Sequence, residues 1–168
     1  MSKQFLDRLK DCIVVFDIDG VLAAYEFGDF CHTTPEWGPE QFKSVDDNPY
    51  VGVPAVPVFQ EYIKNMPSEN VYVCSVAGEE ERECKAAFVT RNYDVDPSHI
   101  IFVDKKDKKL GVLQELKASH PDMEVALVDD TVKTLDNIWL ADRSIRTIHV
   151  SSFFCQEHLA AVTLCTLL

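Results

Sequence analysis

Two aspartates separated by one residue follow an apolar run near the start of the chain. Residues 13–20 are Ile-Val-Val-Phe-Asp-Ile-Asp-Gly, so Asp17 and Asp19 come directly before Gly20. A short run without polar alternation is typical of a strand buried on both faces. Residues i and i+2 of a strand share a face about 6.6 Å apart, and two such carboxylates repel unless a cation lies between them or one holds a proton. The pattern therefore indicates a metal or acid–base site, unless Asp and Gly merely end the strand.

Other polar residues follow later apolar runs and could join the two aspartates. Ser75 comes after Val-Tyr-Val-Cys, Asp129 and Asp130 come after Val-Ala-Leu-Val, and the lysine-rich stretch 104–109 comes after Ile-Ile-Phe-Val. Carboxylates with room for water suit octahedral Mg²⁺ better than Zn²⁺, which prefers Cys and His. A metal ion, a hydroxyl, a cationic side chain and a nucleophile are the groups that phosphoryl transfer needs.

Alternating strands and helices are expected to bring these residues together. Apolar runs predict the strands and a 3.6-residue periodicity predicts the helices. Such alternation implies βαβ units and a parallel sheet covered on both faces, in which ligands bind beyond the carboxyl ends of the strands. The predicted strands are 13–16, 71–74, 100–103, 125–128 and 145–150, and the predicted helices are 56–65, 79–91, 109–119 and 132–140.

The order of these residues resembles the haloacid dehalogenase-like phosphatase superfamily. That family has Asp-x-Asp-Gly after the first strand, Ser or Thr after the second, Lys before a later helix and an acidic pair after the fourth strand. The resemblance covers about residues 10–150. It implies a doubly wound, three-layer α/β sandwich with a Rossmann-like central parallel sheet. The strand that carries the nucleophile would lie between the strands that carry the second and fourth motifs.

The same resemblance implies roles for the motif residues. Asp17 would attack phosphorus and form an aspartyl-phosphate, and Asp19 would protonate the leaving oxygen and then activate water. Family members that cleave carbon–halogen bonds normally lack Asp at the second position, so Asp19 favours phosphate chemistry. The implied catalytic residues are Asp17, Asp19, Ser75 and Lys109, and the implied Mg²⁺ ligands are Asp17, Asp19, Asp130 and Asp129.

The acidic pair leaves one choice open. Adjacent strand residues point to opposite faces, so Asp129 and Asp130 both face Asp17 only if the backbone turns between them. By similarity to the Gly-Asp version of this motif in the family, we expect Asp130 to bind the metal directly and Asp129 to act from behind it or through water.

The lysine-rich stretch leaves a second choice open. Lys109 stands four residues before Leu113 and seven before Leu116, which matches the family's pattern of Lys before a helix. The rest of the stretch is interpreted as a solvated loop. The alternatives to Lys109 are Lys105 and Lys108, and less so Lys106.

Composition limits the partners of the chain. Its 168 residues are expected to form one domain over 1–168, large enough to bury a core. A net charge of −12 argues against extended nucleic-acid binding, which needs clustered Lys and Arg. We find neither an apolar signal core nor a run near the ~20 apolar residues of a membrane span. The cysteines form no Cys-x-x-Cys pair and are expected to be thiols in a reducing cytoplasm: Cys12, Cys31, Cys74, Cys84, Cys155 and Cys165.

Residues 23–53 are predicted to form a lid-like insertion that is rich in Pro, Gly and aromatic residues. Neither this gap nor the one between Ser75 and the lysine-rich stretch has room for the separate cap domain of larger family members, so we expect an open site. The aromatic residues either line a substrate pocket or form a small satellite core. They are Tyr25, Phe27, Phe30, Trp37 and Phe42.

The function expected from these features is Mg²⁺-dependent hydrolysis of a phosphate monoester, carried by a small molecule or exposed on a larger one. One alternative is a receiver-like or degenerate signalling protein that binds metal or phosphate without turnover, with Asp104 as its candidate phospho-acceptor. Another is an interaction protein with a vestigial site. No membrane partner is expected.

Overall fold

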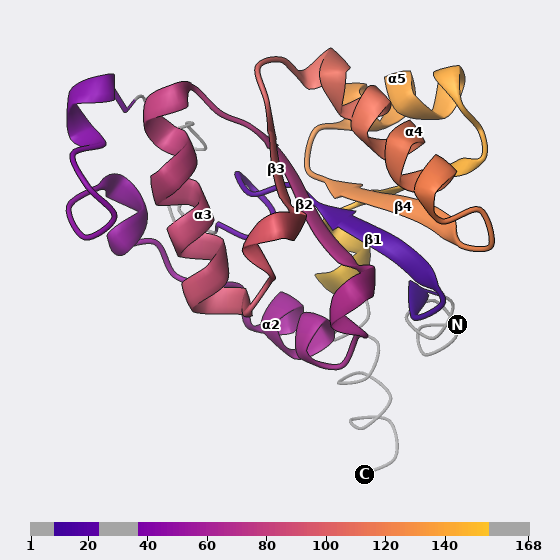
Figure 1. Ribbon diagram of the computed structural model, residues 1–168, viewed down its shortest axis with the longest axis horizontal. Helices are drawn as coiled ribbons and strands as arrows, with labels where there is room; N and C mark the ends of the chain where they lie inside the picture. The colour runs from indigo at the N-terminus through magenta and orange to yellow at the C-terminus, as the bar shows by residue number, and fades with distance from the viewer. Residues whose placement is uncertain (1–8, 24–36, 155–168) are drawn as a thin grey trace, which may run out of the picture.

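A five-stranded parallel sheet forms the centre of the protein in the computed structural model, which describes residues 9–23 and 37–154 (Figure 1). The strand order is β3-β2-β1-β4-β5, so β1 lies between β2 and β4. This is the central position expected for the strand that precedes Asp17. The strands are β1 (Cys12–Phe16), β2 (Val71–Val76), β3 (Ile100–Val103), β4 (Glu124–Asp129) and β5 (Ile145–His149).

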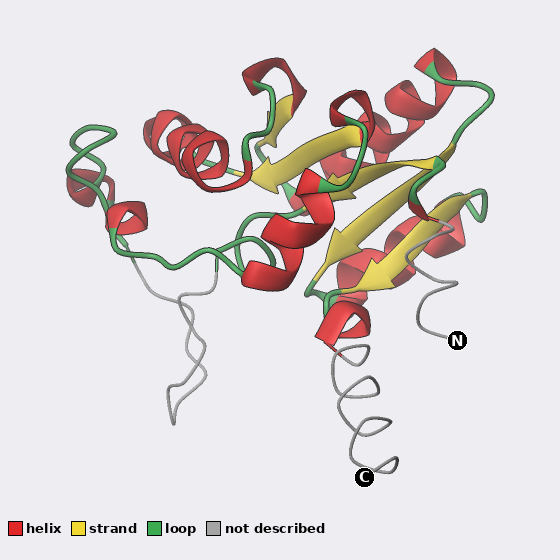
Figure 2. Cartoon of the chain, turned by 90° about the horizontal axis from the view of Figure 1, so that it is seen from below, coloured by secondary structure: helices red, strands yellow, loops and turns green. Residues whose placement is uncertain are grey.

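Helices cover both faces of the sheet (Figures 1 and 2). On one face, α2 and α3 pack against Val14 and Phe16 of β1; on the other, α4 and α5 pack against Ile13 and Val15. The alternation along β1 therefore divides the core into two layers, as the period of two in a strand requires. The helices are α2 (Pro57–Lys64), α3 (Glu79–Tyr93), α4 (Lys109–Ser119) and α5 (Val132–Ala141). The predicted Rossmann-like, doubly wound α/β fold is confirmed.

Most predicted boundaries agree with the structure to within two residues, and one difference concerns the site. Ser75 does not follow β2 but lies inside it, because the ladder continues through Ser75 and Val76, which pair with Phe102 and Val103 of β3. The predicted end of this strand at Cys74 was therefore wrong. A polar side chain does not end a strand whose backbone hydrogen bonds still have a neighbouring partner.

The described part of the predicted insertion, residues 37–53, contains two 3₁₀ turns and an aromatic cluster. The ring of Tyr50 lies 5.2 Å from that of Trp37 and 5.6 Å from that of Phe88 in α3. Trp37 and Phe42 are partly buried and pack against the main core rather than forming a separate small core; a role in substrate binding stays a prediction. The remaining aromatic residues of the insertion lie outside the described residues: Tyr25, Phe27 and Phe30.

Two further sequence predictions concern the environment of the chain. Within residues 9–23 and 37–154, no helix combines the length and apolar character that crossing a membrane requires. Cys74 and Cys84 are buried thiols, whereas Cys31, Cys155 and Cys165 lie outside the described residues.

Candidate functional site

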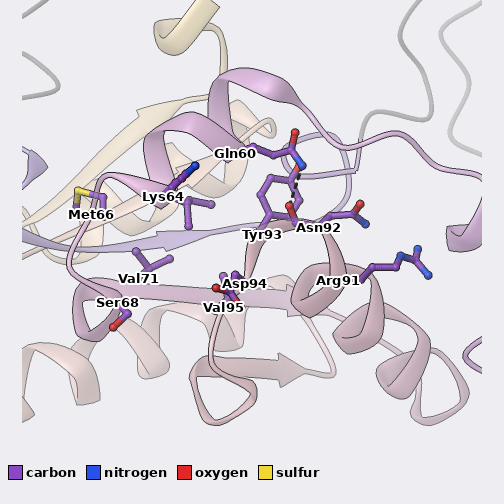
Figure 3. A pocket seen from close by; sticks show the side chains of 11 residues that line it. Gln60, Lys64, Met66, Ser68, Val71, Arg91, Asn92, Tyr93, Asp94 and Val95 are labelled. Atoms are coloured by element: carbon purple, nitrogen blue, oxygen red, sulfur yellow. Dashed lines mark hydrogen bonds between the residues drawn. The ribbon is translucent and has the colours of Figure 1, made fainter.

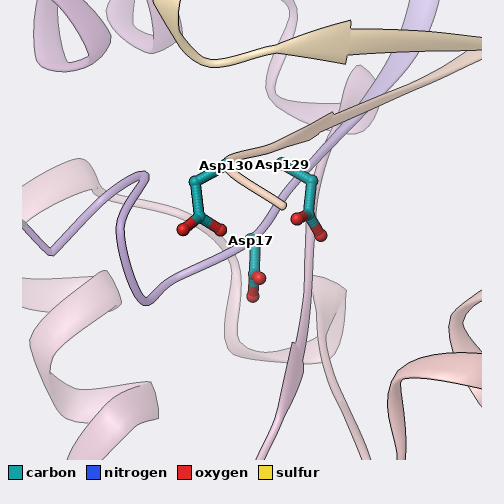
Figure 4. Close-up of side chains that lie close together, drawn as sticks. All are labelled: Asp17, Asp129 and Asp130. Carbon is teal, nitrogen blue, oxygen red and sulfur yellow. The ribbon is translucent and has the colours of Figure 1, made fainter. Parts of the chain in front are cut away.

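Three carboxylates meet at the carboxyl ends of β1 and β4 (Figure 4). Asp17 directly follows β1, and its N–H donates to the carbonyl of Val128 at 2.9 Å. Asp129 ends β4 and Asp130 begins the turn that follows, so both side chains reach Asp17. One carboxylate oxygen from each of the three lies within 4.8 Å of the others. The backbone turn required for both acidic residues to face Asp17 is therefore present.

Lys109 joins two of these carboxylates. Its Nζ lies 2.7 Å from Oδ2 of Asp17 and 2.7 Å from Oδ2 of Asp129, and its side chain is completely buried. An ammonium group has three N–H donors. Among the described residues no third acceptor contacts this one, so one donor is left for a ligand.

The register of α4 explains why Lys109 is the buried lysine. Lys109 is the first residue of the helix, and Leu113 and Leu116 on the same face are buried under the sheet. The other lysines of the stretch are exposed, and Lys106 Nζ donates to Oγ1 of Thr131 at 3.1 Å. The structure thus brings Lys109 into the cluster and leaves Lys105, Lys106 and Lys108 outside it.

Ser75 contributes a buried hydroxyl group. Its side chain is 1% exposed, and its Oγ forms no hydrogen bond with any described residue. The hydroxyl still lies near enough to Asp17 to favour the ionised carboxylate, although its geometry falls short of a hydrogen bond. Because a buried polar group without a partner is unfavourable, this hydroxyl is suited to donate to a ligand oxygen.

Burial sets the electrostatics of Asp17. Removal from water raises the pKa of Asp17 from its ordinary 3.8 to about 6; Lys109 opposes this change and Asp129 adds to it. For Lys109, burial alone would lower the pKa, but the Asp17 and Asp129 carboxylates outweigh it and raise the pKa. Asp17 is therefore ionised at neutral pH, but it lies in an environment that favours neutralisation of its charge.

The two acidic residues after β4 have different surroundings. Both oxygens of Asp129 are engaged, Oδ2 by Lys109 and Oδ1 by the N–H of Thr131 at 2.8 Å. Asp130 is exposed, and Oδ1 accepts a hydrogen bond from Oγ1 of Thr131 at 3.2 Å. A Cβ atom added to Gly20 would lie only 2.6 Å from Oδ2 of Asp130, and Gly20 has a φ of +76°. Asp130 is thus the more available metal ligand, and its carboxylate occupies space that any side chain at position 20 would take up.

Asp19 does not point into this cluster. Its Oδ1 accepts from the hydroxyl of Tyr50 at 2.5 Å and its Oδ2 from Nζ of Lys85 at 2.9 Å. Asp19 was expected to share a face with Asp17, but β1 ends at Phe16 and the chain then turns, so the geometry of a strand no longer applies. The carboxylate of Asp19 is consequently absent from the described group of potential metal ligands, contrary to the sequence prediction.

Tyr50 and Lys85 were not predicted from the sequence. Lys85 stands four residues after Glu81 on α3 and bonds to it at 2.9 Å. In the sequence this spacing indicates only an ordinary helical ion pair. Tyr50 lies in a segment without periodicity, so no signal connected it with Asp19.

The donor set of the cluster suits a hard divalent cation. All of its ligand atoms are carboxylate oxygens, which Mg²⁺, Mn²⁺ and Ca²⁺ prefer, and it has no thiolate or imidazole ligand for Zn²⁺. Three carboxyl groups against the single ammonium group of Lys109 leave a formal excess of two negative charges. The exposure of Asp130 leaves space for water ligands. The residues present therefore fit a hard divalent cation such as Mg²⁺.

A separate cavity of about 400 Å³ lies near the start of β2, at the opposite ends of the strands (Figure 3). Gln60, Lys64 and Arg91 are among its lining residues, and Gln60 Nε2 donates to the carbonyl of Asn92 at 2.9 Å. None of the residues of the acidic cluster lines it. Because ligands of open α/β sheets bind at the carboxyl ends of the strands, the candidate site is the acidic cluster and not this cavity.

Comparisons with known proteins support the fold alone. No protein-family model matches the chain, and no curated protein sequence matches it. A solved structure, that of DsGPDH of Dunaliella salina, is similar with a TM-score of 0.58 and 14% sequence identity. The match covers 88% of this chain but 25% of that one. The chain is therefore similar in fold to about a quarter of that protein.

Removal of the buried cation should destabilise the protein in a manner that depends on pH. Lys109→Met leaves the buried Asp17 and Asp129 carboxylates without their partner, at a cost of about 3–5 kcal/mol in the free energy of unfolding near pH 8. Folding raises the pKa of Asp17 from 3.8 to about 6, so between these values the native state binds a proton at Asp17 that the unfolded chain does not. The loss should therefore be smaller near pH 5, where Asp17 takes up a proton.

Urea unfolding of Lys109→Met and of the exposed control Lys108→Met, at both pH values and without metal, measures this effect. The control should stay within about 0.5 kcal/mol of the parent protein. A loss in Lys109→Met that is equal at pH 5 and pH 8 would contradict the electrostatic account.

Proposed function

We propose that the protein is a Mg²⁺-dependent phosphatase of the haloacid dehalogenase-like type, which hydrolyses a phosphate monoester through an aspartyl-phosphate at Asp17. The observation that carries the proposal is the pairing of Lys109 with Asp17. The lysine keeps one N–H donor for a ligand, and the buried hydroxyl of Ser75 beside Asp17 has no partner among the described residues. A nucleophile flanked by two available donors suits a phosphoryl group.

In the first step, a carboxylate oxygen of Asp17 attacks phosphorus while the bond to the ester oxygen breaks. Lys109 and Ser75 donate to the phosphoryl oxygens, and their positions are fixed before the reaction begins. Asp19 gives its proton to the departing alkoxide. Asp17 remains ionised at neutral pH because its pKa is raised only to about 6.

In the second step, Asp19 takes a proton from water and the resulting hydroxide attacks phosphorus, which releases phosphate and restores Asp17. The residues that would hold Mg²⁺ are Asp17 and Asp130, with Asp129 behind them to anchor Lys109. When bound, Mg²⁺ would neutralise charge on the phosphoryl oxygens and orient them.

The geometry favours this function over that of a receiver-like domain. A receiver needs a phospho-acceptor aspartate at the end of a middle strand, beside the acidic pair. Asp104 is exposed, follows the edge strand β3 and is not a member of the acidic cluster. The strands next to β1 are β2 and β4, which end in Ser75-Val76 and Asp129.

The substrate class follows from the same site, and the location from the cysteines. The acidic chain and the compact cluster support a phosphorylated small molecule, or one exposed phosphate of a larger molecule, rather than extended nucleic acid. Burial raises the pKa of Cys74 to about 12, so its thiol is unreactive. Buried thiols at Cys74 and Cys84 support a reducing cytoplasmic location.

Magnesium should stabilise the folded protein. A ligand at a hundredfold excess over its Kd stabilises the native state by ~2.7 kcal/mol, which corresponds to a rise in Tm of about 5–10 °C. Asp130→Ala should abolish the rise measured by thermal unfolding, whereas Asp136→Ala, an exposed position on α5, should retain it. An unchanged Tm of the parent protein in millimolar Mg²⁺ would count against the metal site.

The nucleophile should be indispensable for turnover. Asp17→Asn retains the shape of the side chain but removes its charge, so kcat with p-nitrophenyl phosphate should fall by at least ~10³-fold, equivalent to over 4 kcal/mol. Asp19→Asn should cost ~10²–10⁴-fold with an alkyl phosphate and less with p-nitrophenyl phosphate, whose leaving group needs little protonation. Full activity in Asp17→Asn would refute the mechanism.

A further inference from the structure

Lys85 uses all of its hydrogen-bonding capacity within the protein. Its Nζ donates to Oδ2 of Asp19 at 2.9 Å and to the carbonyl of Val76 at 2.8 Å, and it lies 2.9 Å from Oε2 of Glu81. Three acceptors match the three N–H donors of an ammonium group. The side chain is only 4% exposed. Lys85 therefore has no donor left for a substrate, in contrast to Lys109.

The acceptors of Lys85 tie Asp19 to two elements of the fold. Val76 is the last residue of β2, next to Ser75, and Glu81 lies in the first turn of α3. The ammonium group of Lys85 therefore links Asp19 to β2, the strand that carries the candidate phosphate-binding hydroxyl of Ser75. Because Lys85 is buried while Asp19 is about one-third exposed, a displaced Asp19 would leave a buried cation without one of its partners.

Tyr50 holds the second oxygen of Asp19. Its hydroxyl donates to Oδ1 at 2.5 Å, and its ring is buried between Trp37 and Phe88. The backbone carbonyl of Tyr50 accepts a hydrogen bond from Arg91 of α3 at 3.3 Å. Tyr50 is thus fixed by its ring and its backbone, and its hydroxyl is presented to Asp19 from residues 37–53.

We propose that Lys85 and Tyr50 are positioning residues that hold the Asp19 carboxylate in one fixed orientation beside the acidic cluster, from which it acts as the acid for the leaving group. This inference rests on the proposed phosphatase function and extends it to α3 and to the segment 37–53. The two partners differ in chemistry: an ammonium group only donates, whereas a phenol donates or accepts. Tyr50 can therefore stay bound to Asp19 whether or not Asp19 carries the proton that it transfers.

The distinguishing measurement is the dependence of turnover on the leaving group. Lys85→Met removes the cation, and Tyr50→Phe removes only the hydroxyl and retains the packed ring. If the two residues position an acid, kcat with glycerol phosphate should fall by about 10²-fold in Lys85→Met and by less than about tenfold with p-nitrophenyl phosphate. KM should change by less than about threefold, and Tyr50→Phe should show the same pattern with a smaller loss.

Control variants separate positioning from stability. Lys85→Arg should recover part of the lost kcat because it retains the charge. Lys117→Met changes a half-buried lysine on α4 that pairs with Asp142, far from Asp19 in the fold, and its kcat should match the parent protein with both esters. Lys85→Met should retain the rise in Tm with Mg²⁺, since Lys85 does not contact the acidic cluster. In an Asp19→Asn background, Lys85→Met should cause no further loss that is specific to glycerol phosphate.

Equal losses on both esters in Lys85→Met and in Tyr50→Phe would overturn the inference and show a purely structural role. Loss of the Mg²⁺-dependent rise in Tm in Lys85→Met would also overturn it, because the effect would then run through the metal ligands. If Asp17→Asn is inactive while Lys85→Met matches the parent protein, the inference fails and the phosphatase function stands. If Asp17→Asn is fully active, the proposed function fails first.

Discussion

The bridge that Lys109 forms between Asp17 and Asp129 is the interaction on which the rest of the site depends. Asp17 follows β1, Asp129 ends β4 and Lys109 begins α4, so the bridge fixes two neighbouring strands and one helix relative to each other. Charges buried away from water are unfavourable unless they are paired. Even with Lys109 in place, burial still raises the pKa of Asp17. The protein thus maintains an electrostatically unfavourable arrangement that a bound cation would relieve.

The two buried lysines of the site differ in how many of their N–H donors the described residues occupy. Lys109 contacts two carboxylates and has a donor to spare, and the neighbouring Ser75 hydroxyl has no partner among the described residues. Lys85 is saturated by Asp19, Glu81 and a backbone carbonyl. The degree of saturation, more than charge or burial, therefore indicates which lysine is available to a ligand.

The sequence predicted the elements that rest on strong local signals. The unbroken apolar run before Asp17 predicted a central buried strand, and Leu113 and Leu116 set the register that places Lys109 under the sheet. Asp19 was predicted less well, because β1 ends at Phe16 and the chain then enters a turn with a positive φ at Gly20, where the alternation of a strand no longer holds. The contacts of Asp19 come from Tyr50 and Lys85, which lie 31 and 66 residues away along the chain. A single sequence carries no local signal for such distant pairs.

Chemical identification of the phosphorylated residue tests the central claim most directly. The protein is mixed with Mg²⁺ and a phosphate monoester, quenched in acid during turnover, reduced with borohydride and digested for mass spectrometry. Reduction of an aspartyl-phosphate gives homoserine, and the account predicts this product at Asp17. Turnover with Asp17 unmodified, or the product at Asp104 instead, would contradict it.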